Sequence, residues 1–200
     1  MTQADLITRL VSTAQAVVSR HADELTQLDQ AIGDGDHGSN LKRGFDAVAS
    51  EAAALAEKPV GEALKAAGMK LVMTVGGASG PLFGTMLMTL GKELGDAPDR
   101  AAFASAFSKA VDAVAARGKS QQGQKTLLDV LYPVSDALAQ GKSGGEIAAI
   151  AAGAADATVP VKATRGRASF LGERSIGHMD PGARSVSLLI AAVAPVLEGK

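Results

Sequence analysis

The sequence predicts an all-α protein that forms a single domain over residues 1–200, with eight antiparallel helices running up and down in a bundle. Aromatic residues make up only 3% of the chain while alanine is abundant, and this composition favours closely packed helices over a β-rich fold. Apolar residues recur at three- and four-residue steps, which is the spacing of one helix face. The connections between these segments are mostly short, so consecutive helices are expected to be antiparallel neighbours.

Each helix is predicted from its apolar spacing and from the residues that end it. Leu6, Leu10 and Leu25 lie on one face of the first helix, and Ser39 or Asn40 is placed to cap the second. Ser79–Gly80–Pro81 opens the fourth, because proline suits the first turn of a helix. Residues 160–182 are irregular. The expected helices are about 3–29, 39–56, 60–75, 79–94, 99–117, 124–140, 143–158 and 183–198.

Composition excludes several classes of protein. The formal net charge of −1 argues against a nucleic-acid or anionic-membrane partner. The chain has no cysteine, which excludes disulfides, thiolate metal sites and a cysteine nucleophile. No stretch approaches 18 uninterrupted apolar residues, so no transmembrane helix is predicted. The polar start MTQADLITRL does not resemble a secretion signal, and a cytoplasmic protein is expected.

The run GDGDHG at 33–38 predicts a metal site. Asp34 and Asp36 lie two apart in an extended loop, and Asp29 ends the helix before them, so three carboxylates are expected to cluster. Such a cluster needs a compensating cation, and oxygen ligands favour a hard ion such as Mg²⁺. An EF-hand is excluded, because the fifth and twelfth loop positions are Gly38 and Phe45. The alternative is a loop in which Asp36 only caps the next helix.

Two further stretches suit phosphate. GGASGP at 76–81 precedes a helix, where free backbone N–H groups bind anions; the alternative is a tight turn between helices. GKSQQGQKT at 118–126 misses the P-loop pattern by one residue and follows a helix, so Lys125 and Thr126 are expected to begin the sixth helix. Arg165 and Arg167 are candidates for a phosphate clamp, although isolated surface arginines usually have no such role.

Four motifs together resemble the L subunit of bacterial dihydroxyacetone kinase, the subunit that binds ADP. They are LDQAIGDGDHGSN, GGASGPLFGT, KTLLD and GRASFLGERSIGHMDPGA, and the resemblance extends over essentially the whole chain. It implies an eight-helix antiparallel barrel with the nucleotide bound at one end.

The resemblance also implies a set of site residues. Asp29, Asp34 and Asp36 would hold two Mg²⁺ ions that bridge the nucleotide phosphates. Arg167 would reach phosphate and stabilise the moving phosphoryl group, which makes it the expected catalytic residue. The other implied nucleotide contacts are His37, Gly38, Ser39 and Asn40 at the second helix, Ala78 and Ser79 at the fourth, Gly118 and Leu127 on the adenine side, and Asp180, Pro181 and Gly182 closing the pocket.

The implied function is that of a kinase subunit that binds ADP or ATP with Mg²⁺. It would pass the γ-phosphoryl group to dihydroxyacetone held on a separate K subunit. In the phosphotransferase type, which we expect here, a phosphohistidine on an M subunit fed from phosphoenolpyruvate rephosphorylates the bound ADP. The alternatives are ATP as direct donor, a regulatory module that engages a transcription factor according to its nucleotide state, and a divalent-ion-dependent structural protein without nucleotide.

Overall fold

The computed structural model describes residues 1–95 and 99–199, and within them it is helical without any strand. Ten α-helices and one 3₁₀ helix follow one another within these described residues. They are α1 (Gln3–Arg20), α2 (Ala22–Ile32), α3 (His37–Ala49), α4 (Ala52–Ala56), α5 (Val60–Thr74), α6 (Ser79–Glu93), α7 (Arg100–Gly118), α8 (Leu128–Ala139), α9 (Gly144–Asp156), η1 (Arg167–Ser175) and α10 (Pro181–Leu197).

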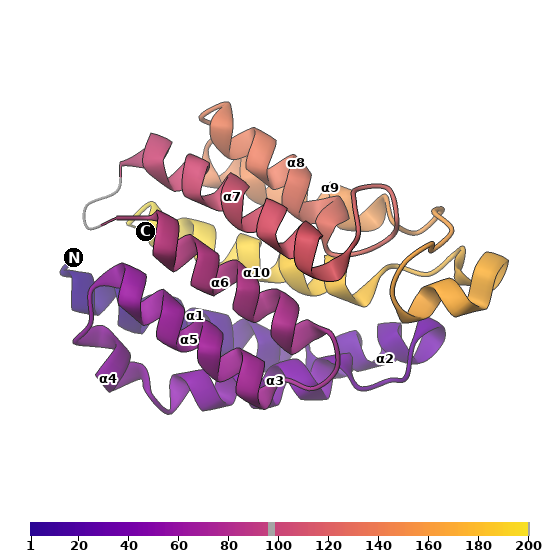
Figure 1. Cartoon of the computed structure of the whole chain (residues 1–200), viewed down its shortest axis with the longest axis horizontal. Helices are drawn as coiled ribbons and strands as arrows, with labels where there is room; N and C mark the ends of the chain where they lie inside the picture. Colours follow the sequence, from indigo (N-terminus) through magenta and orange to yellow (C-terminus); the bar gives the residue numbers. More distant parts are fainter. Residues whose placement is uncertain (96–98, 200) are drawn as a thin grey trace.

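The long helices form a closed ring. From α3 to α10, apart from the short α4, each long helix packs against the next, and α1 packs against both α3 and α10. Because α10 also packs against α9, the ring closes between the last helix and the first. Figure 1 shows α6 and α10 lying between the N-terminal helices and the layer of α7, α8 and α9. The predicted antiparallel barrel is confirmed.

Eight helices were predicted, and ten α-helices occur in the described residues because two of the expected ones are interrupted. The first breaks at His21 (φ −105°, ψ 10°), whose ring lies 2.6 Å from the Glu24 carboxylate. The second is interrupted at residues 50–51. It also begins at His37, so the predicted caps Ser39 and Asn40 lie inside it, and Asp36 is the N-cap residue instead.

The sixth helix begins at Leu128, four residues later than predicted, and Lys125 and Thr126 belong to the loop before it. The Asp129 carboxylate shapes this loop by accepting the N–H groups of Gly123 (2.6 Å) and Thr126 (2.7 Å). The stretch predicted to be irregular contains η1, and the other helix ends fall within three residues of the prediction.

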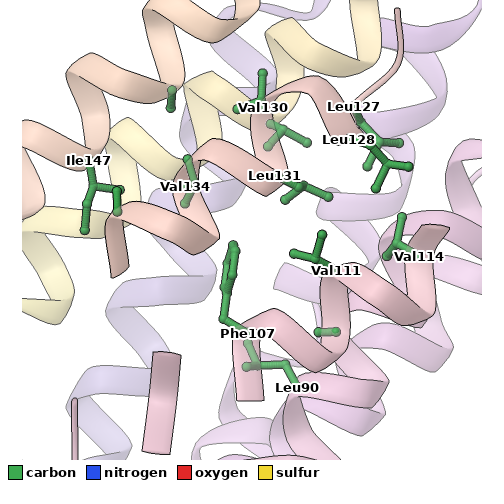
Figure 2. Close-up of a cluster of buried hydrophobic side chains, with 14 of the residues drawn as sticks. Leu90, Phe107, Val111, Val114, Leu127, Leu128, Val130, Leu131, Val134 and Ile147 are labelled. Atoms are coloured by element: carbon green, nitrogen blue, oxygen red, sulfur yellow. The ribbon is translucent and has the colours of Figure 1, made fainter. Parts of the chain in front are cut away.

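Two clusters of buried side chains stabilise the barrel. One is built from α1, α2, α3, α5 and their neighbours, and the other from α6 to α10. Figure 2 shows the second cluster, in which Val111 and Val114 of α7 lie opposite Leu128 and Leu131 of α8. Burial of such aliphatic side chains is the main favourable term in folding, at roughly 25 cal/mol per Å² of apolar surface. No described helix has the length and apolar character needed to span a membrane.

The up-and-down order brings every second connection to the same end of the barrel. Four connections meet there: 33–36, 75–78, the lysine loop (residues 119–127) and the lid segment (residues 157–180, containing η1). In Figure 1 the orange lid segment lies beside α2, at the end opposite the two chain termini. Ile32 of α2 packs there with Ala163 and Ala168 of the lid segment.

Candidate functional site

Three aspartates converge at this end of the barrel. Asp29, Asp34 and Asp36 each offer a carboxylate oxygen, and these oxygens all lie within 4.8 Å of one another. Asp29 is buried in the last turns of α2, and its Oδ2 accepts the backbone N–H groups of Asp36 (2.9 Å) and His37 (3.1 Å). The first aspartate therefore fixes the loop that carries the other two. We call Asp29 and residues 33–36 the aspartate loop.

This arrangement fits a hard divalent cation better than a helix cap. The side chain of Asp36 makes no capping hydrogen bond, so its carboxylate is not used to begin α3, contrary to the capping alternative. A Cβ at Gly33 would lie 2.0 Å from Asp29 Oδ1, so glycine keeps that oxygen uncovered. Three clustered carboxylates repel one another unless a cation compensates them, and Mg²⁺ prefers such oxygen ligands.

Close backbone packing brings the start of α3 to the site. A Cβ at Gly38 would lie 1.9 Å from the carbonyl oxygen of Ala22, so only glycine lets α3 approach α2 this closely. Ser39 is exposed, and its hydroxyl donates to the Asp36 carbonyl (3.0 Å). The predicted contacts Gly38 and Ser39 thus shape and continue the aspartate loop.

The His37 ring links three elements of the site. Its Nδ1 lies 3.1 Å from Ser79 Oγ at the start of α6, and its Nε2 lies 3.0 Å from Ser185 Oγ on α10. Because the Ser185 hydroxyl donates to the Gly182 carbonyl (2.9 Å), its oxygen accepts the proton on Nε2, and Nδ1 then accepts from Ser79. Burial lowers the pKa of His37, while the charges of Asp29 and Asp36 oppose the shift. The neutral ring therefore positions Ser79.

The start of α6 is the predicted phosphate cradle. Ala78 is its N-cap residue and Ser79 its first residue, where backbone N–H groups lack helical partners. The Asn40 side chain lies against Gly76 in the same turn. Arg43 fixes this amide by donating to Asn40 Oδ1 (2.7 Å) and to the Thr74 carbonyl (2.9 Å). Sequence reasoning missed Arg43, which acts through Asn40.

A cavity of about 340 Å³ opens beside this cradle. Three of its walls are predicted nucleotide contacts: Ala78, Gly118 and Leu127. The apolar pattern places Leu82, Val114 and Leu128 in a helix core, so the sequence did not predict that these three side chains line the cavity. The remaining lining residues are Pro81, Leu82, Val114, Arg117, Ser120, Thr126, Leu128, Arg165 and Gly166. Apolar walls with a few polar groups suit a flat organic ring system.

The lid segment places Arg167 beside the aspartates. Its Nη1 lies 3.0 Å from Asp34 Oδ2, and both side chains are exposed, so the pair contributes little to stability. Arg165, the other candidate for a phosphate clamp, instead lines the cavity. The structure therefore separates the two arginines, with only Arg167 next to the expected metal ligands.

The start of α10 closes the site from the other side. Asp180 caps this helix by accepting the N–H of Ala183 (2.7 Å), and Gly182 packs against Leu127. Pro181 is buried as the first helical residue. Burial raises the pKa of Asp180 to about 7, and the Asp129 charge adds to this, while the N–H groups of Ala183 and Gly182 and the charge of Lys125 act in the opposite direction. The predicted residues 180–182 thus join the lysine loop to α10.

Known proteins share this sequence and fold. The DAK2 domain model matches residues 31–195. The ADP-binding subunit DhaL of the PEP-dependent dihydroxyacetone kinase of Escherichia coli (strain K12) is 40% identical over 188 residues, which cover 89% of this chain and 90% of that protein. The corresponding subunit of dihydroxyacetone kinase 1 of Listeria innocua is 41% identical over 177 residues, covering 88% of each.

A solved structure has the same architecture. The dihydroxyacetone kinase from C. freundii, in complex with AMP-PNP and Mg²⁺, superposes with a TM-score of 0.81 at 24% identity, over 96% of this chain. This chain spans 34% of that kinase chain, and the likeness shows the shared fold. The family model and the full-length relatives agree: the chain belongs to the DAK2 domain family and, within it, to the ADP-binding DhaL subunits of dihydroxyacetone kinases.

Proposed function

We propose that this chain is the nucleotide-binding, phosphoryl-transferring subunit of a dihydroxyacetone kinase. It would bind ADP or ATP with Mg²⁺ at the aspartate end of the barrel and pass the γ-phosphoryl group to dihydroxyacetone on a separate K subunit. One observation carries the proposal: three aspartate carboxylates converge within 4.8 Å, with Arg167 beside them. The reaction would take place in the cytoplasm.

The aspartates would hold two magnesium ions. Asp29, Asp34 and Asp36 supply up to six carboxylate oxygens, although two N–H groups already occupy Asp29 Oδ2. When bound, Mg²⁺ neutralises charge on the nucleotide phosphates. Few carboxylates per ion suit magnesium, because phosphate oxygens and water complete its coordination shell.

The remaining residues would orient the nucleotide and stabilise charge. The backbone N–H groups at Ala78 and Ser79, at the start of α6, would bind the phosphates, and the Asn40 amide, fixed by Arg43, lies against the same turn. Arg167 would leave its pairing with Asp34 to contact the transferring phosphoryl group, where a guanidinium stabilises developing charge. The cavity bounded by Gly118 and Leu127 would hold the base.

We further propose that the bound ADP is rephosphorylated in place by a phosphohistidine on an M subunit. The PEP-dependent relatives support this donor over free ATP. Both partners would dock at the lid end, where Phe170 lies in η1 with Arg167, is 88% exposed and offers an aromatic anchor. A role in engaging a transcription factor remains a prediction, and no contact among the described residues favours it.

Reconstitution tests the proposal. The purified chain is mixed with K and M subunits, dihydroxyacetone, and either the phosphoenolpyruvate-fed phosphocarrier chain or ATP, and dihydroxyacetone phosphate is measured. We expect product with the phosphocarrier chain while labelled ADP stays bound to the protein. Product with ATP alone, accompanied by rapid exchange of ADP, would favour the direct donor. No product from either donor, with no Mg-ADP bound, would refute the proposal.

A further inference from the structure

We propose that Lys125 is a positioning residue of this kinase site: its buried ammonium ties the lid segment to the lysine loop and so sets the place of Arg167. The inference rests on the proposed function for its catalytic consequence. We call the hydrogen bonds of the Lys125 ammonium to the lid segment the lysine clamp, and this clamp follows from the contacts of Lys125 alone.

Lys125 is buried in an unusual way. Only 1% of its surface is exposed, and its Nζ donates to the carbonyl oxygens of Ser175 (2.7 Å), Val161 (2.9 Å) and, more weakly, Val159 (3.4 Å). An ammonium has three donors and no acceptor, so three carbonyls satisfy it completely. Lysine is almost never buried to this degree without such partners. Burial lowers the pKa of Lys125, and the nearby Asp180 carboxylate opposes this shift.

The three carbonyls come from the two limbs of the lid segment. Val159 and Val161 lie on the limb that leaves α9, and Ser175 is the last residue of η1. The limbs also bond to each other, through Gly177 N–H to the Val159 carbonyl (2.9 Å) and Ala163 N–H to Ser175 Oγ (2.9 Å). Lys125 therefore sits at the junction where the lid segment closes on itself.

Arg167 lies in the same lid segment, at the start of η1, and Lys125 holds Ser175 at the end of η1. A kink at Gly172 (φ +57°) separates these two ends, so Arg167 depends on the junction through the fold of the lid segment and not through one continuous helix. The lid segment has other long-range anchors among the described contacts: Thr164 N–H donates to the Gln124 carbonyl (3.3 Å), Ala163 and Ala168 pack on Ile32, and the exposed Arg167 pairs with Asp34 (3.0 Å). Loss of the ammonium would leave the carbonyls of Val161 and Ser175 without this donor, which favours local opening of the segment, while the Val159 carbonyl keeps the Gly177 N–H.

The backbone at Lys125 supports a positioning role. Its φ of +62° lies in the left-handed region, which L side chains rarely adopt and glycine adopts without cost. A lysine there accepts strain so that its side chain can reach the carbonyls. Leu127, two residues after Lys125, lies in the wall of the cavity proposed to hold the base. Lys125 therefore connects this cavity with the lid segment that carries Arg167.

Limited proteolysis without nucleotide tests the clamp. An arginine-specific protease is added to wild type, Lys125→Met and Lys162→Met, and cleavage at the exposed Arg165 and Arg174 is followed by mass spectrometry. We expect cleavage to be at least about tenfold faster in Lys125→Met. Lys162→Met is the matched control: it removes a surface pairing with Glu173 in the same segment (2.7 Å) and should change the rate by less than about twofold. Equal rates in all three proteins would overturn the proposal.

Chemical rescue separates a positioning ammonium from a general packing role. The chain has no cysteine, so Lys125→Cys introduces a single thiol, which bromoethylamine converts, in the unfolded chain, into a lysine analogue of nearly equal length. After refolding, the alkylated protein should regain slow cleavage, whereas alkylation with a neutral group of similar size should not. Rescue by the neutral group would overturn the proposal.

Coupling to Arg167 tests the catalytic consequence. Arg167→Ala should slow phosphoryl transfer in the wild-type background and have little further effect in Lys125→Met, because both changes remove the same placed guanidinium. Additive losses of transfer rate in the double variant would contradict the proposal that Lys125 acts through Arg167. Failure of the proposed function would appear separately, as a wild-type chain that binds no Mg-ADP yet keeps its lysine-dependent resistance to cleavage.

The wild-type protein keeps the proposal testable even where Lys125→Met does not fold. Trace labelling with acetic anhydride compares the reactivities of individual lysines within one sample. We expect Lys125 to react at least about tenfold more slowly than Lys162, which is exposed on the lid segment. Equal reactivity would refute the buried clamp.

Discussion

The aspartate loop and the lid segment handle the same proposed ligand but are built in different ways. The aspartate loop is held by hydrogen bonds between residues only seven or eight apart, from Asp29 to the N–H groups of Asp36 and His37. The lid segment is held by contacts from Lys125 to residues 34 to 50 positions later. A locally bonded loop forms with its helix, whereas a segment fixed from a distance can open while the barrel stays folded.

This difference suggests a division of labour. The aspartate loop would provide a preformed cation site and dominate binding of Mg-ADP. The lid segment carries Arg167, which would act on the phosphoryl group in transit and must let partner subunits approach. Four substitutions test this division.

Asp34→Asn should weaken the binding of Mg-ADP at the aspartate loop. Removing one carboxylate of the cluster is expected to weaken Mg-ADP binding by about 100-fold or more, because the two remaining carboxylates cannot replace the lost negative charge. Helix content should stay unchanged, since the lost pair with Arg167 is exposed. Calorimetry and circular dichroism measure both. Asp23→Asn, an exposed aspartate elsewhere on α2, should bind normally; if Asp34→Asn also does, Asp34 is no ligand.

Gly38→Ala should show that the aspartate loop depends on close packing. The new Cβ would lie 1.9 Å from the Ala22 carbonyl, so α3 must move away from α2, at a cost of about 2 kcal/mol or more in the free energy of unfolding. Urea denaturation gives the value. The control is Gly153→Ala inside α9, where a Cβ meets nothing within 4 Å and should stabilise the helix by up to about 1 kcal/mol. Equal stability of Gly38→Ala and wild type would mean that the contact is looser than described.

Arg167→Ala should affect the transfer side selectively. We expect the rate of phosphoryl transfer to fall about tenfold, with a smaller loss of ADP affinity, because the guanidinium is needed mainly as charge moves. Single-turnover kinetics and equilibrium binding separate the two quantities. Arg174→Ala, at the exposed end of the same 3₁₀ helix, serves as control. An equal loss of rate and affinity would identify Arg167 as a simple clamp.

Asp180→Asn should reveal the smallest effect, as a change in pH dependence. The folded pKa of about 7 lies above the ordinary 3.8, so the folded chain keeps a proton that the unfolded chain loses, and the contribution of Asp180 to stability falls as the pH rises from about 4 to 7. The charges facing it are Asp129, which adds to the shift, and Lys125, which opposes it.

Asparagine keeps the cap on Ala183 without ionising. The free energy of unfolding of the variant should therefore equal that of wild type near pH 4.5 and exceed it by about 1 kcal/mol at pH 8. This difference is smaller than the full pKa shift of Asp180 would give, because Asp180 keeps some exposed surface. Denaturation at the two pH values measures the difference. The same pH dependence in both proteins would show that Asp180 does not carry it.

The comparison also explains how far the sequence could be interpreted. The aspartate loop lies within one short motif, so residue types and spacing were enough to predict Asp29, Asp34 and Asp36 as a cluster. The ring of helices followed from apolar spacing and short connections. The interruption at His21 was missed because the apolar pattern continues through it.

The lid side could not be predicted in the same way. Lys125 stood in a near-miss of a P-loop and was expected to begin a helix, because its carbonyl partners lie far along the chain. Leu82 and Val114 have the spacing of core residues, and only the closed barrel exposes them to the cavity. The position of Arg167 next to Asp34 likewise depends on how the lid segment folds back.

Crystals grown with excess Mn²⁺ and ADP would test the central claim most directly, since manganese replaces magnesium at oxygen sites and gives an anomalous signal. The account predicts anomalous peaks within coordination distance of the carboxylates of Asp29, Asp34 and Asp36, with the phosphates of ADP bridging to the start of α6. An ordered ADP elsewhere, or these carboxylates bonded only to water and backbone at saturating ligand, would contradict it.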